Sequence, residues 1–192
     1  MRDEEFIRGP VPMTKREIRL ASVDRLELAQ ARLLIDVGAG TGSVGIEAAS
    51  RYPQLRVMAV ERNPDALALI RANSAKFALD ERMDIVAGDA PLPLAVSADA
   101  VFIGGSGGNL AAIIGWAGEL LVPGGRLVIN LILQENLGEA LGALRQAPFV
   151  RADCVQMQVA SLAPLGSGHF FKPNNPAFII SCLKENTHDR AL

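Results

Sequence analysis

The chain has 192 residues, of which 49% are hydrophobic, and a formal net charge of -2. This length fits a single α/β domain, residues 1–192, and the weak negative charge gives no general attraction to nucleic acid. No run approaches the ~18 unbroken apolar residues of a membrane span, and the acidic start is unlike a signal peptide. We therefore expect a cytoplasmic protein that binds neither nucleic acid nor membrane.

The first predicted elements lead into a buried strand. Thr14 and Glu17 have the spacing of a capping box, and apolar residues follow at helical spacing, so we expect a helix within the N-terminal segment 1–31. A Rossmann-like core, residues 32–184, then begins with the apolar run 33–35, which predicts a strand covered on both faces. A polar tail, residues 185–192, is expected to fray.

A glycine-rich turn follows this strand directly. It consists of Gly38, Ala39, Gly40, Thr41 and Gly42 and is preceded by Asp36. The spacing from Gly40 to Gly45, with Glu61 further on, also satisfies a dinucleotide fingerprint. Asp36 favours a different nucleotide, because an acid beside the cleft repels a pyrophosphate and attracts the ammonium group of S-adenosylmethionine. A turn whose glycines serve only packing is the plain structural alternative.

Helix and strand signals alternate along the rest of the chain. Pro53 ends the helix after the glycine turn, and Asn63 is expected to cap a later helix that has Pro64 in its first turn. Predicted strands cover residues 55–60, 83–87, 98–103 and 126–133. Three predicted helices end near residues 52, 77 and 121, and a further helix covers residues 135–147. Residues 121–125 are expected as a turn. Strands at 150–160 and 177–183, joined by a loop rich in glycine, proline and asparagine, should pair antiparallel.

Further candidate residues lie where predicted strands end. Glu61 follows the second strand, where it is placed to accept hydrogen bonds from both ribose hydroxyls, and Asp89 with Ala90 follows the third, where an adenine would lie. A turn residue that caps a loop explains Asp89 nearly as well. The rhythm of five parallel βα units before an antiparallel pair resembles the doubly wound, seven-stranded fold of class I S-adenosylmethionine-dependent methyltransferases, whose last strand is antiparallel.

A second glycine-rich segment follows the fourth strand. It consists of Gly104, Gly105, Ser106, Gly107 and Gly108. Methyltransferases that act on base nitrogens resemble one another in having, at this place, an Asn or Asp followed by two prolines and an aromatic residue. This chain has the glycine-rich segment there. Glycines instead leave open backbone amides and a flat floor, which suits a wide planar substrate, although a loop that only reaches the next helix remains the alternative.

These motifs together resemble one family, the decarboxylating precorrin methyltransferases of cobalamin biosynthesis. The resemblance spans nearly the whole chain, and residues 102–108 carry its most specific part. A similar domain forms half of a bifunctional enzyme, whereas this chain begins with its own Met1 and so resembles the free-standing form. The resemblance implies methylation of carbon 15 of a cobalt-precorrin, loss of carbon dioxide from the ring C acetate, a homo-oligomer such as a tetramer, and Thr14 beside the methionine end of S-adenosylmethionine.

Carboxylate arms of such a substrate need cationic partners. Lys15 is one candidate, and the other cations considered are Arg8, Arg16, Arg19, His169 and Lys172. A solvated face is the ordinary explanation of such helix cations. Glu135 and His169 are candidates for proton transfer, and no catalytic residue is assigned. Cys154 and Cys182 are expected as buried thiols, and no cysteine or histidine cluster predicts a metal site.

Three other function classes compete. A generic methyltransferase of RNA or protein would share the cofactor residues but needs a basic groove or a peptide-reading surface, which the sequence does not indicate. A binding module without catalysis is disfavoured by the intact set of Asp36, the glycines and Glu61. A nicotinamide-dependent enzyme would bind NAD(P) and not respond to S-adenosylhomocysteine.

Overall fold

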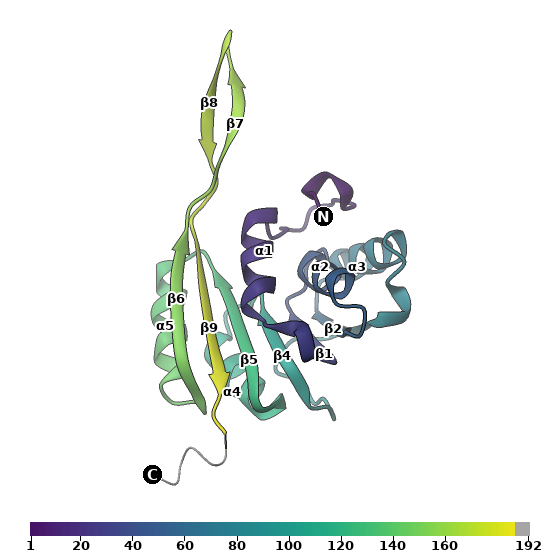
Figure 1. Ribbon diagram of the computed structural model, residues 1–192, viewed down its shortest axis with the longest axis vertical. Coiled ribbons are helices and arrows are strands. Elements are labelled where there is room, and N and C mark those ends of the chain that lie inside the picture. Colours follow the sequence, from purple (N-terminus) through teal and green to yellow (C-terminus); the bar gives the residue numbers. More distant parts are fainter. Residues whose placement is uncertain (187–192) are drawn as a thin grey trace.

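The computed structural model describes residues 1–186, and its centre is a seven-stranded sheet (Figure 1). The strand order is β3-β2-β1-β4-β5-β9-β6, in which β9 is antiparallel to both β5 and β6 and the other neighbours are parallel. The strands are β1 (Leu33–Val37), β2 (Arg56–Glu61), β3 (Met83–Ala87), β4 (Ala98–Ile103), β5 (Leu121–Leu131), β6 (Phe149–Met157) and β9 (Ala177–Lys184). The expected doubly wound sheet and its antiparallel last strand are confirmed.

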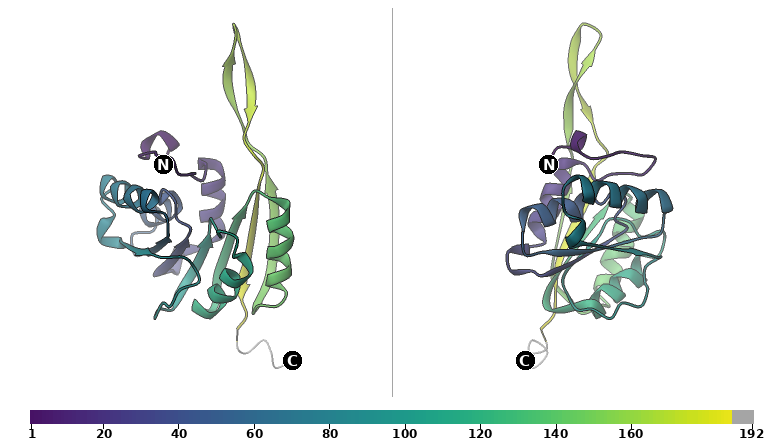
Figure 2. Two further views of the ribbon diagram at one scale, coloured as in Figure 1. Left: turned by 180° about the vertical axis from the view of Figure 1, so that it is seen from behind. Right: turned by 90° about the vertical axis from the view of Figure 1, so that its right-hand side faces the viewer.

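Helices cover both faces of the sheet (Figure 2). One hydrophobic cluster joins the sheet to α1 (Arg16–Arg25), α2 (Ser43–Arg51) and α3 (Pro64–Lys76). A second cluster joins the opposite face to α4 (Leu110–Leu120) and α5 (Gln134–Leu144). Three short 3-10 helices complete these layers: η1 (Asp3–Glu5), η2 (Leu28–Gln30) and η3 (Asp80–Arg82). Burial on both faces explains why the central strands are apolar almost throughout.

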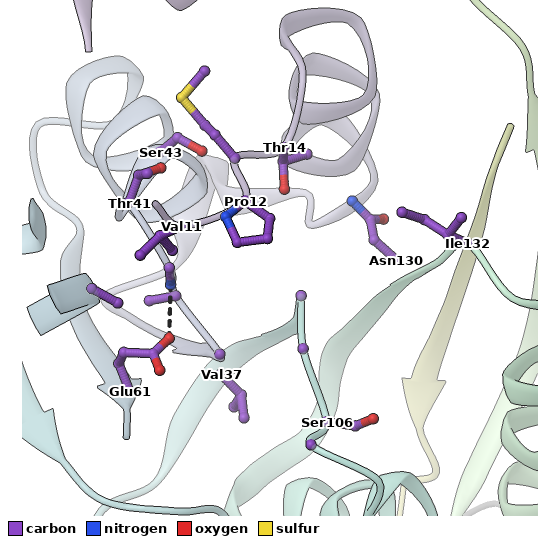
Figure 3. A pocket seen from close by; sticks show the side chains of 18 of the residues that line it. Val11, Pro12, Thr14, Val37, Thr41, Ser43, Glu61, Ser106, Asn130 and Ile132 are labelled. Carbon is purple, nitrogen blue, oxygen red and sulfur yellow. Dashed lines mark hydrogen bonds between the residues drawn. The ribbon is translucent and has the colours of Figure 1, made fainter. Parts of the chain in front are cut away.

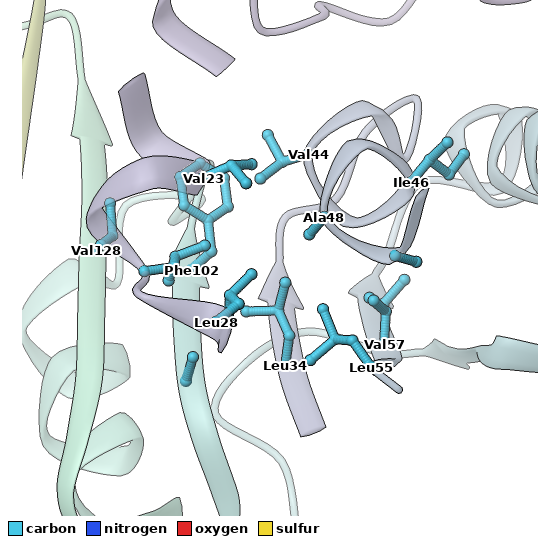
Figure 4. Close-up of a cluster of buried hydrophobic side chains, with 14 of the residues drawn as sticks. Val23, Leu28, Leu34, Val44, Ile46, Ala48, Leu55, Val57, Phe102 and Val128 are labelled. Carbon is cyan, nitrogen blue, oxygen red and sulfur yellow. The ribbon is translucent and has the colours of Figure 1, made fainter. Parts of the chain in front are cut away.

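Alternation along the strands builds the first cluster. Leu34, Val57 and Phe102, from three neighbouring strands, point to the α1 and α2 side and are at most 1% exposed (Figure 4). Because side chains alternate between faces, Asp36 lies on the same face as Leu34. A carboxylate therefore occupies a position where the pattern demands an apolar side chain.

The helix starts follow the sequence signals in one case and depart from them in another. Asn63 caps α3 as expected, accepting a hydrogen bond from the Asp65 amide at 2.9 Å, with Pro64 at the first helical position. The predicted capping box of α1 is wrong: Lys15 is the N-cap and no side chain caps the helix. The Thr14 carbonyl instead accepts a hydrogen bond from the Arg19 guanidinium at 2.9 Å, so this segment is held by a buried cation.

Two boundaries differ from expectation around β5. The strand begins at Leu121, within the predicted turn, and its pairing with β4 jumps from Leu121 opposite Ala98 to Arg126 opposite Ala100. The intervening residues, with Gly124 at φ 75°, form a bulge inside the strand. The strand also ends at Leu131 rather than at residue 133, and α5 ends at Leu144.

The expected loop between β6 and β9 is instead a β-hairpin. β7 (Ala160–Leu165) and β8 (Gly168–Pro173) pair antiparallel and project away from the body of the molecule (Figures 1 and 2). Pro164 and Pro173 are compatible with this pairing because a two-stranded hairpin consists only of edge strands, where a missing N–H is tolerated. The glycines and prolines of this segment mark the turn and edges of a hairpin.

Three smaller expectations concern burial, membranes and the tail. Cys182 is buried, and burial raises its thiol pKa to about 12, but Cys154 is exposed on β6, so the prediction of two buried thiols is half wrong. Within residues 1–186, no helix has the length and apolar character to cross a membrane. Of the tail expected to fray, residues 187–192 lie outside the described part.

Candidate active site

A cavity of about 740 Å³ opens at the carboxyl ends of β1, β2, β4 and β5. Here the strand order changes direction between β1 and its neighbours β2 and β4, which is where doubly wound sheets bind ligands. The N-terminal segment contributes Val11, Pro12 and Thr14 on the side opposite Val37 and Ser106 (Figure 3). The volume lies within the range of about 300–1,000 Å³ typical of small-molecule sites.

The first glycine turn, residues 38–42, has a left-handed backbone at Gly38, Gly40 and Gly42. A Cβ at Gly38 would lie 2.6 Å from the carbonyl oxygen of Gly105, so this glycine admits the second glycine-rich segment. A Cβ at Gly40 would lie 3.1 Å from the carbonyl oxygen of Pro12. The glycines therefore bring the chain's own backbones together around the cavity.

Four of the five turn residues line the cavity, namely Gly38, Ala39, Gly40 and Thr41. Gly42 does not, because it faces the side chains of Ile46 and Ile70, each 3.3 Å from the position of a Cβ. The position of Gly42 supports a role in the turn itself, and its contact with the cofactor stays a prediction. The Thr41 hydroxyl oxygen is buried and has no hydrogen-bond partner among residues 1–186.

Glu61 ends β2 at the cavity wall, where sequence reasoning placed it. Its Oε2 accepts a hydrogen bond from the Gly40 amide at 2.9 Å, and its Oε1 accepts from the amides of Arg62 and Asn63 at 2.8 and 2.9 Å. These three bonds fix the carboxylate between the first glycine turn and α3. Oε2 keeps an acceptor lone pair for a ligand hydroxyl.

Asp36 lies behind the turn rather than beside the cleft. Its side chain is 1% exposed, and Oδ2 accepts a hydrogen bond from the Gly45 amide of α2 at 3.0 Å. Burial, opposed by that hydrogen bond and reinforced by the charge of Glu61, raises the pKa of Asp36 to about 7. Asp36 does not line the cavity, so its carboxylate lies behind the turn and not beside the cleft as expected, and its contact with a bound ammonium group stays a prediction. Gly45 provides the space for this carboxylate, since its own Cβ would lie 3.1 Å from Oδ2.

Asp89 and Ala90 both line the cavity, as expected of an adenine site. Asp89 is largely exposed and forms an ion pair with Arg62 at 3.1 Å. Sequence reasoning missed Arg62, although it directly follows Glu61 and so had to lie at the same strand end. Within residues 1–186, Lys15 and Arg62 are the cations that line the cavity.

The second glycine loop, residues 104–108, lies next to the first. Gly104, Gly105, Ser106 and Gly107 line the cavity, but Gly108 does not, so the substrate contact expected of Gly108 is not supported by its position. A Cβ at Gly104 would lie 2.9 Å from the Phe102 ring, whereas a Cβ at Gly105 meets only Gly38, 3.8 Å away. The flat cavity wall expected from four glycines is therefore limited to the surface around Gly105.

The N-terminal cations divide into two groups. Lys15 lines the cavity and lies 3.7 Å from the carboxylate of Asp3. Arg19 is fully buried, with ion pairs to Asp3 at 2.9 Å and Glu47 at 3.2 Å, and its guanidinium lies 4.9 Å from the centre of the Phe6 ring. Arg19 therefore anchors the N-terminal segment and is unavailable to a substrate carboxylate.

Both candidates for proton transfer lie outside the lining of the cavity. Glu135 is an exposed residue in the first turn of α5, and His169 is exposed on β8 of the hairpin; neither lines the cavity. The positions of these two side chains therefore give no support to a role in proton transfer.

The half of the cavity beyond Ser106 is formed by residues that the sequence analysis did not select. Asn130 on β5 donates a hydrogen bond to the Ser22 hydroxyl at 2.8 Å, and Asn174 and Asn175 follow the hairpin. Apolar residues, Leu131, Ile132, Val159 and Ala177, complete this half. Asn130 had a detectable signal, since it interrupts the apolar run of β5 at its carboxyl end.

Comparisons with known proteins show the family to which the chain belongs. The family model described as a precorrin methyltransferase domain matches residues 6–184. The chain is 56% identical over 191 residues to the cobalt-precorrin-6B C(15)-methyltransferase (decarboxylating) of Salmonella typhimurium, covering 99% of each chain. Among solved structures, the precorrin-6y C5,15-methyltransferase of Geobacter metallireducens has a TM-score of 0.88 at 34% identity, covering 96% of this chain and 97% of that one.

A precorrin 8W decarboxylase from Methanobacterium thermoautotrophicum has a TM-score of 0.85 at 33% identity, covering 94% of this chain and 98% of that one. The family model covers residues 6–184, and the relatives named here match nearly the full length of the chain. The chain therefore belongs to the precorrin methyltransferase family, whose members take the methyl group from S-adenosylmethionine.

Proposed function

We propose that this chain transfers the methyl group of S-adenosylmethionine to carbon 15 of cobalt-precorrin-6B and removes the ring C acetate carboxylate as carbon dioxide. The observation that carries the proposal is the 56% identity to the Salmonella enzyme over 99% of both chains. The cavity supports it, because one half offers the polar groups of a nucleoside site and the other half is lined mainly by asparagines and apolar side chains.

The donor half fits an adenosyl group joined to an amino acid. Glu61 is our proposed partner of the ribose hydroxyls, and Asp89 with Ala90 our proposed adenine site. The unpartnered Thr41 hydroxyl and the lining backbone of the first glycine turn suit the carboxylate and sulfonium end, with Thr14 across the cavity. The group that binds here supplies an electrophilic methyl on positively charged sulfur.

The acceptor half positions a carbon nucleophile. A meso carbon of a reduced tetrapyrrole is enamine-like, so a carbon–carbon bond to the methyl forms as the carbon–sulfur bond breaks, and no protein base is required. Gly105 leaves space for a flat macrocycle to approach the donor half. Correct orientation alone supplies as much as about 7 to 11 kcal/mol of barrier reduction in favourable cases.

Decarboxylation uses the same half of the cavity. When the carboxylate leaves as carbon dioxide, its electron pair enters the conjugated macrocycle, which acts as the electron sink. The apolar side chains of Leu131, Ile132 and Val159 favour loss of the hydration shell that stabilises this carboxylate in water. Lys15 and the asparagine amides at positions 130, 174 and 175 are our proposed partners for the remaining carboxylate arms.

The hairpin supports a homo-oligomer. Leu162 and Phe171, which face each other across β7 and β8, are 63% and 69% exposed, and Leu165 is 65% exposed on the other face. A two-stranded hairpin is marginally stable alone in water, and its free edges and apolar faces need a cover. A second copy of the chain offers a matching hairpin, so we propose that subunits associate through β7 and β8.

Mass spectrometry of the reaction product tests the proposed activity. The enzyme is incubated with cobalt-precorrin-6B and S-adenosylmethionine, and a parallel reaction omits S-adenosylmethionine. We expect a product that has gained one methyl group and lost one carbon dioxide. An unchanged tetrapyrrole, together with methyl transfer to RNA or protein, would support the generic methyltransferase instead.

A further inference from the structure

Arg62 joins the two strand ends that form the adenine side of the cavity. It follows Glu61 at the end of β2, and its Nη1 lies 3.1 Å from Oδ2 of Asp89, just beyond the end of β3. Both side chains are more than half exposed, and an ion pair of this kind contributes at most about 1 kcal/mol to stability. Overall stability is therefore not what the pair mainly provides.

The same guanidinium lies against the second glycine loop, which follows β4. A Cβ at Gly107 would lie 2.8 Å from Nη2, 2.9 Å from Cζ and 2.9 Å from Nη1 of Arg62. Nearly equal distances to three atoms of one planar group mean that the plane faces the Gly107 backbone. A lysine at position 62 would keep the charge but would lack this flat surface.

The second glycine loop rests on few supports. Gly104 donates its amide to the Val37 carbonyl, Gly105 packs on Gly38, and the Asn109 amide closes the turn by donating to the Ser106 carbonyl at 3.0 Å. Between Ser106 and Asn109 the backbone is left-handed at Gly107 and Gly108. The guanidinium of Arg62 thus packs on the part of the loop that has the least regular structure.

We propose that Arg62 is a positioning residue that ties the second glycine loop to Asp89, so that occupation of the adenine site and the position of the acceptor loop are linked. The proposal rests on the assignment of the two halves of the cavity made under the proposed function. Arg62 acts through the loop, and its planar face and its charge contribute separately: the face holds Gly107, and the charge holds Asp89.

Hydrogen exchange of the ligand-free protein tests whether Arg62 holds the second glycine loop in place. We expect Arg62→Ala and Arg62→Lys to raise the exchange rate of the Asn109 amide several-fold. Arg56→Ala is the matched control, because Arg56 starts the same strand and pairs with Asp84 at 3.1 Å with similar exposure, far from the loop. Exchange at Asn109 that is unchanged in Arg62→Ala, or raised equally in Arg56→Ala, overturns the proposal.

A double-mutant cycle tests the contact with Gly107. Gly107→Ala places a methyl group where the guanidinium lies, so it should weaken S-adenosylhomocysteine binding, measured by calorimetry, more in the wild-type background than in Arg62→Ala. The strain at φ 57° is common to both backgrounds and cancels in the comparison. Additive effects of the two substitutions overturn the proposal. Neither experiment uses a tetrapyrrole, so a failure of the proposed substrate leaves both outcomes interpretable.

Discussion

The buried carboxylate of Asp36 should make the stability of the protein depend on pH in a direction opposite to that of most acids. Burial raises its pKa from 3.8 to about 7. The folded state therefore holds a proton at pH values where the unfolded state has released it, and stability falls as pH rises from about 4 to about 7 and is level above. The full difference corresponds to about 4 kcal/mol, of which about 2 to 3 kcal/mol is lost between pH 5 and 8.

Urea unfolding of Asp36→Asn across this range measures the effect. The asparagine oxygen still accepts the Gly45 N–H bond but the side chain does not titrate, so the variant should lose about 2 to 3 kcal/mol less than wild type between pH 5 and 8. Asp24→Asn, which alters an exposed carboxylate on α1, is the control. A wild-type-minus-variant difference in unfolding free energy that stays constant with pH would refute the reasoning.

Three other substitutions separate the roles assigned to this chain. Gly105→Val adds bulk to open cavity space, so product formation should be lost while calorimetric S-adenosylhomocysteine affinity stays near wild type; surviving turnover would contradict the flat surface at Gly105. Arg19→Met removes a buried ion-pair partner of Glu47 and should lower the free energy of unfolding by about 3 kcal/mol. If Arg19 served only to bind substrate, the free energy of unfolding would not change. Phe171→Asp should reduce the mass measured by light scattering to that of smaller assemblies; an unchanged mass would remove the hairpin from the subunit interface.

The fold was largely predictable because its local signals agree with one another. The apolar run before the first glycine turn and the proline after Asn63 both mark elements that the structure contains. The hairpin was missed because its prolines and glycines have the composition of a loop, and nothing local shows that Leu162 lies opposite Phe171. The two residues are only nine positions apart, but strand formation depends on the packing context of a segment and not on its composition alone.

The site was predictable at the level of strand ends but not of side-chain direction. Glu61 was placed correctly because an acid at the end of a parallel strand borders the cleft whichever way it turns. Asp36 was placed wrongly, although alternation with Leu34 assigns it to the helix-covered face. The glycines were treated as equivalent, yet each missing Cβ makes room for a different neighbour, which only the packed structure reveals.

Contact between the two glycine segments leads to a sharper expectation for Gly38. Its missing Cβ position lies 2.6 to 2.8 Å from three backbone atoms of Gly105, well inside van der Waals contact, so Gly38→Ala must push the donor and acceptor segments apart by close to 1 Å. A misplacement of about 1 Å costs about 100-fold in rate where orientation supplies the barrier reduction. We therefore expect kcat to fall by about that factor, far more than S-adenosylhomocysteine affinity changes. A kcat within threefold of wild type would show that methyl transfer does not depend on this contact.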